Sequence, residues 1–243
     1  MKRETGVPDE RERATEPEAV AVRYARRSAC VEDARYDPMS APVCMSLQER
    51  HRALVELLRL AKLEPVAHKR VLEIGCGSGS NLLELIALGF SPRNLVGNEL
   101  LPDRVTMARE RLPAAVEILS GDASRLELAP SSFDVVYQST VFTSLLDRDF
   151  QERLAARMWE WTRPGGGVLW YDFTFDNPSN SDVRGVGLPR IRELFPDGRI
   201  EARRVTLAPP INRRVSHIHP SLYTIFNLLP FLRTHLLCWI SKR

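Results

Sequence analysis

The stretch that decides the fold reads Val71-Leu72-Glu73-Ile74-Gly75-Cys76-Gly77-Ser78-Gly79-Ser80. A short apolar run leads into a turn with three glycines at alternate positions, and a helical pattern follows at once in residues 81–88. Strand, glycine-rich turn and helix in this order predict the first crossover of a doubly wound α/β domain, where backbone approaches a nucleotide-like ligand. Glycine suits such a turn because it adopts positive φ and places no Cβ between main chain and ligand.

Strands and helices alternate along most of the chain around this stretch. The spacing of apolar residues predicts each element. The expected strands lie at 70–74, 94–99, 116–119, 133–138, 168–173, 199–207 and 234–241. The expected helices lie at 47–60, 80–89, 102–111, 149–161, 189–195 and 220–232, and a long loop is expected at 174–188. Because crossovers between parallel strands are right-handed, this alternation predicts a mostly parallel sheet.

Two carboxylates follow the next two expected strands. Glu99 ends the strand 94–99, where an acid can accept hydrogen bonds from both ribose hydroxyls of a nucleoside. Asp122 stands in Gly121-Asp122-Ala123-Ser124, directly after the strand 116–119. The alternatives are a surface acid at a helix start for Glu99, and a turn or helix N-cap for Asp122.

The glycine spacing separates two classes of ligand. The turn reads G-x-G-x-G, and Ser80 and Asn81 stand where the dinucleotide fingerprint G-x-G-x-x-G would have its last glycine. A pyrophosphate needs close approach to a helix N-terminus, which that glycine allows. The spacing therefore favours a nucleoside without a pyrophosphate over NAD or FAD.

These features resemble the class I S-adenosylmethionine (SAM)-dependent methyltransferases, whose motif I reads E/D-x-G-x-G-x-G. The resemblance is carried by residues 68–173 and continues, by the order of elements, to the end of the chain. It implies a doubly wound seven-stranded sheet in the order 3-2-1-4-5-7-6, with the seventh strand antiparallel and helices on both faces. It implies a methyltransferase domain over 41–243. Residues 1–20 mix both charges with Thr, Pro and Gly and are expected to be disordered, so residues 1–40 are expected to be an N-terminal extension, partly disordered or a helical cap. A substrate loop and lid would occupy about 174–232.

The resemblance also implies a cofactor site for SAM, with S-adenosyl-L-homocysteine as the product. In the family, the acid at the position of Glu73 orients the turn and the amino-acid end of the ligand, and the acid at Asp122 holds the adenine amino group. The implied cofactor-binding residues are Glu73, Gly75, Cys76, Gly77, Gly79, Asn81, Glu99, Leu100, Asp122, Ala123 and Gln138.

The sequence after the fourth strand bears on the acceptor. Gln138-Ser139-Thr140 replaces the Asp/Asn-Pro-Pro-Tyr of enzymes that methylate amines of nucleobases or glutamine, which argues against that subclass. The resemblance implies a metal only with an acid at the position of Gln138 and a later Asp-Asn pair, as in the metal-dependent catechol-type enzymes. Asp176-Asn177 could be such a pair, but Gln138 is not an acid, so no metal is expected. A hydroxyl or protonated amine as acceptor requires a base. The candidate catalytic bases are Asp172 and His217, with His219 beside it; the alternatives are a loop cap and a pair of surface histidines.

Net charge and composition limit the classes of partner and the cellular location that the sequence predicts. The net charge of +3 is too small to predict nucleic-acid binding. Residues 184–214 nevertheless hold eight arginines and three acids, which is either a solvated face or an attraction for an anionic small molecule. The four cysteines lack metal-ligand spacing, and residues 1–18 lack the apolar core of a signal peptide, so a cytoplasmic protein is expected. The apolar run at 223–232 is too short to span a membrane.

The sequence therefore predicts a SAM-dependent methyltransferase acting on a small-molecule acceptor, specifically an O-methyltransferase of a bacterial natural-product or glycan pathway. Two alternatives stay open: an RNA or protein methyltransferase, and a non-catalytic SAM-binding module. The expected helix 220–232 is a lid over the acceptor, a helix packed on the sheet, or part of a homodimer contact.

Overall fold

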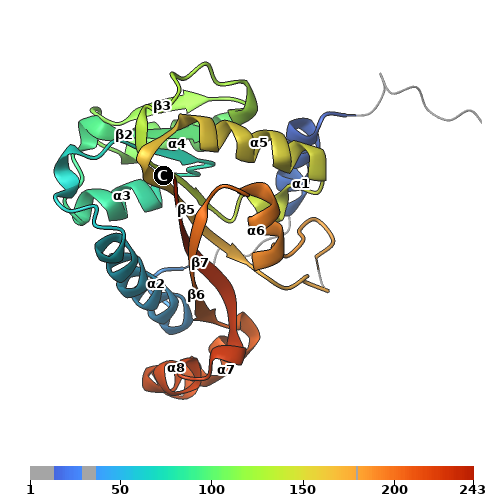
Figure 1. Ribbon diagram of the computed structural model, residues 1–243. Coiled ribbons are helices and arrows are strands. Elements are labelled where there is room, and N and C mark those ends of the chain that lie inside the picture. Colours follow the sequence, from blue (N-terminus) through green and yellow to red (C-terminus); the bar gives the residue numbers. More distant parts are fainter. Residues whose placement is uncertain (1–13, 29–36, 179) are drawn as a thin grey trace, which may run out of the picture.

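The computed structural model describes residues 14–28, 37–178 and 180–243 (Figure 1). Of residues 1–20, which were expected to be disordered, 1–13 lie outside the described residues, whereas 16–20 are helical. The rest of the 1–40 extension includes one helix, α1 (Glu16–Ser28), and the start of a second, α2 (Ala41–Leu60), follows it. Residues 29–36 between them also lie outside the described part.

Seven strands form one sheet in the order β3-β2-β1-β4-β5-β7-β6, which confirms the predicted order. β7 is antiparallel to both of its neighbours, and the other pairs are parallel. The strands are β1 (Val71–Ile74), β2 (Leu95–Glu99), β3 (Glu117–Ser120), β4 (Phe133–Ser139), β5 (Thr162–Phe173), β6 (Arg199–Leu207) and β7 (Arg233–Ser241).

Helices cover both faces of this sheet (Figure 1). On one face α1, α5 (Arg148–Trp161) and α6 (Leu188–Leu194) share an apolar cluster with Leu72 and Trp170. On the other face α2, α3 (Ser80–Ala87) and α4 (Pro102–Arg111) pack around Val71 and Leu169. Neighbouring strand residues point to opposite faces, so the apolar strands at the centre are buried on both sides.

Three elements differ from the prediction by more than two residues at one end. α2 begins at Ala41 rather than 47, with Pro42 in its first turn, where proline suits a helix. β5 begins at Thr162 rather than 168, because Gly165 and Gly166 continue the ladder through hydrogen bonds with Lys242. The expected helix 220–232 is shorter, α8 (Pro220–Asn227), and is followed by a single 3-10 turn, η6 (Pro230–Leu232).

A helix that the sequence did not predict, α7 (Pro209–Ile218), precedes α8. Pro209 and Pro210 stand in its first turn, and proline suits that position because the first turn of a helix does not use its N–H groups. α7 and α8 pack against each other and against α2, at the end of β6 (Figure 1). Among the described helices none is both long and apolar enough to cross a membrane.

Candidate functional site

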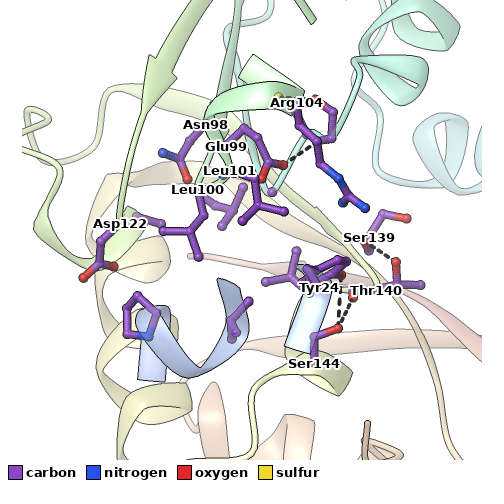
Figure 2. Close-up of a pocket in the computed structure, with 18 of the residues that line it drawn as sticks. Tyr24, Asn98, Glu99, Leu100, Leu101, Arg104, Asp122, Ser139, Thr140 and Ser144 are labelled. Atoms are coloured by element: carbon purple, nitrogen blue, oxygen red, sulfur yellow. Dashed lines mark hydrogen bonds between the residues drawn. The ribbon is translucent and has the colours of Figure 1, made fainter. Parts of the chain in front are cut away.

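A cavity of about 790 Å³ lies at the carboxyl edge of the sheet. Its floor is made by the ends of β1, β2 and β4, where Ile74 of β1 lies opposite Asn98 of β2 and Gln138 of β4. The strand order reverses between β1 and β4, and ligands of doubly wound sheets bind at such a switch point. α1 lines another side of the cavity, which we call its roof, and Tyr24 of this helix is labelled in Figure 2.

The glycine turn presents bare backbone to this cavity. Gly77 has a φ of +57°, and a Cβ built on it would meet no atom within 4 Å, so it would project into open space. Gly79 also has a positive φ, but its Cβ would lie 2.6 Å from Leu112 Cδ1. Gly77 is therefore open towards a ligand, whereas Gly79 is required by packing and does not line the cavity.

Glu99 connects the end of β2 with the glycine turn. Its buried carboxylate accepts the N–H of Gly77 at 2.8 Å and the N–H of Leu101 at 2.9 Å. Each carboxylate oxygen has a further acceptor position, so Glu99 can still accept hydroxyl groups from the cavity. Asn98 makes an equivalent link to the next loop, donating to Gly121 O at 3.0 Å.

Asp122 lies on the cavity wall and is also a helix N-cap. Its Oδ1 accepts the N–H and the hydroxyl of Ser124, each at 2.8 Å, at the start of η4 (Ala123–Arg125). Ala123 follows it on the wall. The alternative interpretation of Asp122 as a cap is thus present in the structure, together with its position beside the cavity.

A buried hydrogen-bonded chain supports the turn from beneath. Glu73 Oε1 accepts Asn81 Nδ2 at 2.6 Å, and Asn81 Oδ1 accepts Arg50 Nη2 at 2.9 Å. Arg50 also pairs with Glu84 at 3.0 Å. Burial raises the pKa of Glu73 to about 8, although the Asn81 hydrogen bond and the Arg50 charge lower it. Glu73 is fully buried, and of these four hydrogen-bonded side chains Asn81 is the one that lines the cavity. Glu73 therefore holds Asn81 in position.

The β4–α5 turn forms the opposite wall. Thr140 lines the cavity with a φ of +58°, and its N–H donates to Tyr171 O at 2.8 Å. A β-branched residue in the left-handed region costs about 1–3 kcal/mol, and such strain gathers at functional sites. Gln138 lies beneath the turn, fully buried, and its Oε1 accepts the N–H of Val141 at 3.1 Å. Gln138 therefore shapes the wall without lining the cavity.

α1 was the main part of the site that sequence reasoning missed. Its Pro17, Val20 and Tyr24 line the cavity, and the Arg104 guanidinium of α4 lies 4.5 Å from the Tyr24 ring centroid (Figure 2). The Tyr24 hydroxyl lies 3.3 Å from Ser144 Oγ on the far wall. The spacing of Val20 and Tyr24, four residues apart, was the available signal for an apolar helix face.

Comparison with known proteins agrees with this geometry. Residues 71–166 match the family described as a methyltransferase domain. The chain is 30% identical over 179 residues to a trans-aconitate 2-methyltransferase of Afipia carboxidovorans, covering 72% of this chain and 61% of that protein. It is 32% identical over 171 residues to a fatty-acid O-methyltransferase of Mycolicibacterium smegmatis, covering 65% and 60%. The chain thus spans about three fifths of the length of these relatives.

A solved SAM-dependent methyltransferase from Archaeoglobus fulgidus has the same fold. The TM-score is 0.56 at 14% identity, over 80% of this chain and 98% of that one. The chain carries a class I SAM-dependent methyltransferase domain. Eight of the eleven expected cofactor residues line one cavity: Gly75, Cys76, Gly77, Asn81, Glu99, Leu100, Asp122 and Ala123.

The expected catalytic residues lie away from this cavity. Asp172 is fully buried and accepts the Thr143 hydroxyl at 2.5 Å and the Thr143 N–H at 3.3 Å; burial raises its pKa to about 7. His217 is exposed on α7, and His219 caps α8 by accepting the Ser221 N–H at 3.2 Å. None of the three lines the cavity, and their role in catalysis stays a prediction.

The arginines of residues 184–214 do not gather at the cavity. Arg190 pairs with Glu152 and Glu193 beside α5, and Arg203 pairs with Glu56 of α2. Arg104 is the arginine on the cavity wall, and the charge count along the sequence did not include it. Within the described residues no group of three or more His, Cys, Asp or Glu side chains is arranged to hold a metal ion, and metal independence stays a prediction.

Proposed function

We propose that this protein transfers the methyl group of SAM to an oxygen atom of a small acceptor that bears a carboxylate. The cofactor half of the proposal rests on the cavity at the β1–β4 switch point. The acceptor half rests on the absence of a candidate base among the described residues that line the cavity, which favours a nucleophile that is already deprotonated when it binds.

The residues present fit SAM. Gly77 and Gly121 both have positive φ and leave space where a Cβ would stand, so the backbone can approach an adenosine closely. In the proposal Glu99 accepts the ribose hydroxyls, and Asp122 faces the adenine. The volume of about 790 Å³ lies within the usual range of sites for ligands of this size and leaves room for an acceptor.

A wall without a base favours a carboxylate. Among the described residues that line the cavity there is no histidine or lysine, and the two acids, Glu99 and Asp122, accept hydrogen bonds on the nucleoside side. SAM supplies a methyl group bonded to a positively charged sulfur. An acceptor carboxylate oxygen forms the new O–C bond as the C–S bond breaks, and no proton has to be removed. The wall then contributes alignment and exclusion of water.

The names of two relatives support this class of acceptor. Trans-aconitate and a fatty acid are both carboxylic acids. The basic segment that suggested an anionic acceptor is dispersed in the fold, so the attraction in this proposal comes from Arg104 at the cavity. A place in a bacterial natural-product or glycan pathway, a cytoplasmic location and a homodimer stay predictions.

Calorimetric titration with SAM and S-adenosylhomocysteine tests the cofactor half. We expect micromolar binding to the wild type and a loss of about a hundredfold or more in Glu99→Ala, since hydrogen bonds to a charged group contribute about 1.5–3 kcal/mol each. Glu117→Ala, which removes an exposed acid on the neighbouring β3, is the matched control and keeps wild-type affinity. Absence of binding to the wild type would contradict the whole proposal.

Transfer of a labelled methyl group to a panel of acceptors tests the other half. The panel contains small carboxylic acids, alcohols, amines, tRNA and unfolded protein, and methyl esters are the expected products. Asp172→Asn should keep kcat within about tenfold and leave its pH profile unchanged, whereas removal of a general base costs about 10²–10⁴-fold. Methylation of tRNA or protein alone would favour the first alternative. SAM binding without transfer to any acceptor would favour a binding module.

A further inference from the structure

Several large apolar side chains are exposed at the C-terminal helices, where α7 and α8 also expose charged and polar side chains. Five of the apolar side chains, between the end of α7 and η6, make up what we call the C-terminal tip; these are Ile218, Ile225, Leu228, Leu229 and Phe231. Phe231 is 70% exposed and Leu228 is 69% exposed. The inner face of the same helices is also apolar, since Val215 and Tyr223 are buried against Leu207. Five exposed large apolar side chains within residues 218–231 indicate a contact surface.

A positively charged groove adjoins the C-terminal tip. This arginine groove, of about 590 Å³, lies between α2 and β6 and reaches η6 at Pro230. Its basic side chains are Arg52, Arg203, Arg204 and Arg233.

The carboxylates of the groove compensate only part of this charge. Glu56 forms an ion pair with Arg203. Glu49 accepts the N–H of Thr206 at 3.0 Å, and burial raises its pKa. Arg233 donates to the backbone oxygens of Asn227, at 2.7 Å, and Arg204, at 3.1 Å, which are neutral acceptors. The groove therefore holds four guanidinium groups against two carboxylates.

The sequence around both features has one sign of charge. No Asp or Glu occurs after Glu201, whereas residues 202–243 contain seven Lys and Arg residues. Exposed apolar side chains next to uncompensated arginines are the pattern of a surface that lies in the interface of an anionic membrane. A symmetric contact between two copies would bring these like charges together, which is unfavourable.

We propose that the C-terminal tip and the arginine groove dock this protein on a phospholipid bilayer that carries anionic lipids. Ile218, Leu228 and Phe231 enter the boundary between headgroups and acyl chains. The groove arginines bind the lipid phosphates. This docking is peripheral, because the helices that carry the tip have ten and eight residues and lie at the end of the fold (Figure 1). It is independent of the proposed reaction.

Sedimentation of the full-length protein with vesicles tests the proposal. We expect binding to vesicles of phosphatidylcholine mixed with phosphatidylglycerol that is at least tenfold stronger than to phosphatidylcholine alone, and that weakens as salt rises. Equal or absent binding to both kinds of vesicle would overturn the proposal.

Two variants and their controls locate the contact. Leu228→Asp/Phe231→Asp removes the apolar contact, and Arg52→Glu/Arg204→Glu reverses charge in the groove. Each should lose at least tenfold in affinity for the anionic vesicles. The controls change exposed groups elsewhere, Leu60→Asp at the end of α2 and Arg93→Glu/Arg192→Glu, and should bind like the wild type.

Two further results would count against a membrane surface. If the controls lose as much affinity as the variants, the binding is a general effect of charge and the proposal is wrong. The second result would come from sedimentation velocity. If the wild type is a dimer that does not bind vesicles, and Leu228→Asp/Phe231→Asp dissociates this dimer, the C-terminal tip is an interface between copies and the proposal is wrong. Circular dichroism of each variant confirms that it is folded.

Discussion

At the β1–β2–β4 end of the sheet the strands are buried between two large apolar clusters. The apolar cluster of α7 and α8 at the β6 end contains three buried side chains among the described residues, Leu207, Val215 and Tyr223. The first end positions backbone amides and two carboxylates within one cavity. The second end buries few apolar side chains and exposes five large ones in the C-terminal tip.

The difference shows how one domain separates two tasks. Holding a nucleoside requires backbone at fixed positions, and rigid packing on both sides of the strands supplies it. The C-terminal helices carry less buried surface, so their opening costs less free energy and their faces are available for other contacts. The following predictions test whether the two ends are as distinct as this comparison states.

The pH dependence of stability reports on the buried cofactor end and carries the largest expected effect. Burial raises the pKa of Glu73 from 4.5 to about 8, so the folded state binds this proton more tightly than the unfolded state. The stabilisation from Glu73 is therefore complete below about pH 4.5 and is lost as pH rises through about 8. Glu73→Gln removes this dependence, and above pH 8 its free energy of unfolding should exceed that of the wild type by several kcal/mol.

Urea unfolding at several pH values measures the effect. Asp172, whose pKa burial raises to about 7, acts in the same direction, and His235, whose pKa burial lowers to about 4, acts in the opposite direction between pH 4 and 6.5. Both remain in the variant, so they cancel in the difference. Glu117→Gln, at an exposed site, is the control. A constant difference at every pH would show that Glu73 is charged in the folded state.

Substitution of Gly77 in the glycine turn should lower SAM affinity more than it lowers stability. Gly77→Val and Gly89→Val both place a β-branched residue at positive φ, which costs about 1–2 kcal/mol or more of stability. Only the first directs a side chain into the cavity, so SAM affinity should fall by about a hundredfold or more in Gly77→Val and stay near wild type in Gly89→Val. Calorimetry and urea unfolding of both variants separate the two effects. Equal affinities would show that no ligand approaches Gly77.

The C-terminal helices should open without the cofactor end. Tyr223→Ala removes the largest side chain of their small core, at a cost of about 3 kcal/mol or more. Hydrogen exchange should accelerate in α7 and α8 and stay unchanged in β1 and β4, with SAM affinity within twofold of wild type. Tyr223→Phe keeps the ring and is the control. Loss of protection throughout the sheet would mean that the two ends unfold as one unit.

The roof of the cavity should contribute a smaller increment. Tyr24→Ala removes the ring beside which Arg104 lies, and a cation–π contact of this kind contributes about 0.5–2 kcal/mol. We expect SAM to dissociate about three- to tenfold faster in stopped-flow measurements. Tyr24→Phe keeps the ring and should resemble the wild type. A dissociation rate that is unchanged in Tyr24→Ala would show that α1 does not retain the ligand.

Local patterns brought most of the expected cofactor residues to one cavity, because the turns there depend on residues that are close in sequence. The glycine turn and Glu99 each follow directly from the strand before them, and parallel strands bring their carboxyl ends to one edge. Glu73 and Gln138 are buried and do not line the cavity, and their part in cofactor binding stays a prediction. Position next to a motif does not reveal whether a side chain points into the cavity or under it.

The sequence by itself determined the α/β class, the strand order that the family resemblance implies, and the two acids at the cavity, since periodicity and glycine conformation act over a few residues. Only the tertiary structure decided the rest: that Asp172 binds Thr143 inside the fold, that α1 covers the cavity, and that the basic segment is dispersed around the molecule. These outcomes depend on which distant surfaces meet. Burial and pairing across many residues of sequence leave no periodic signal in the chain.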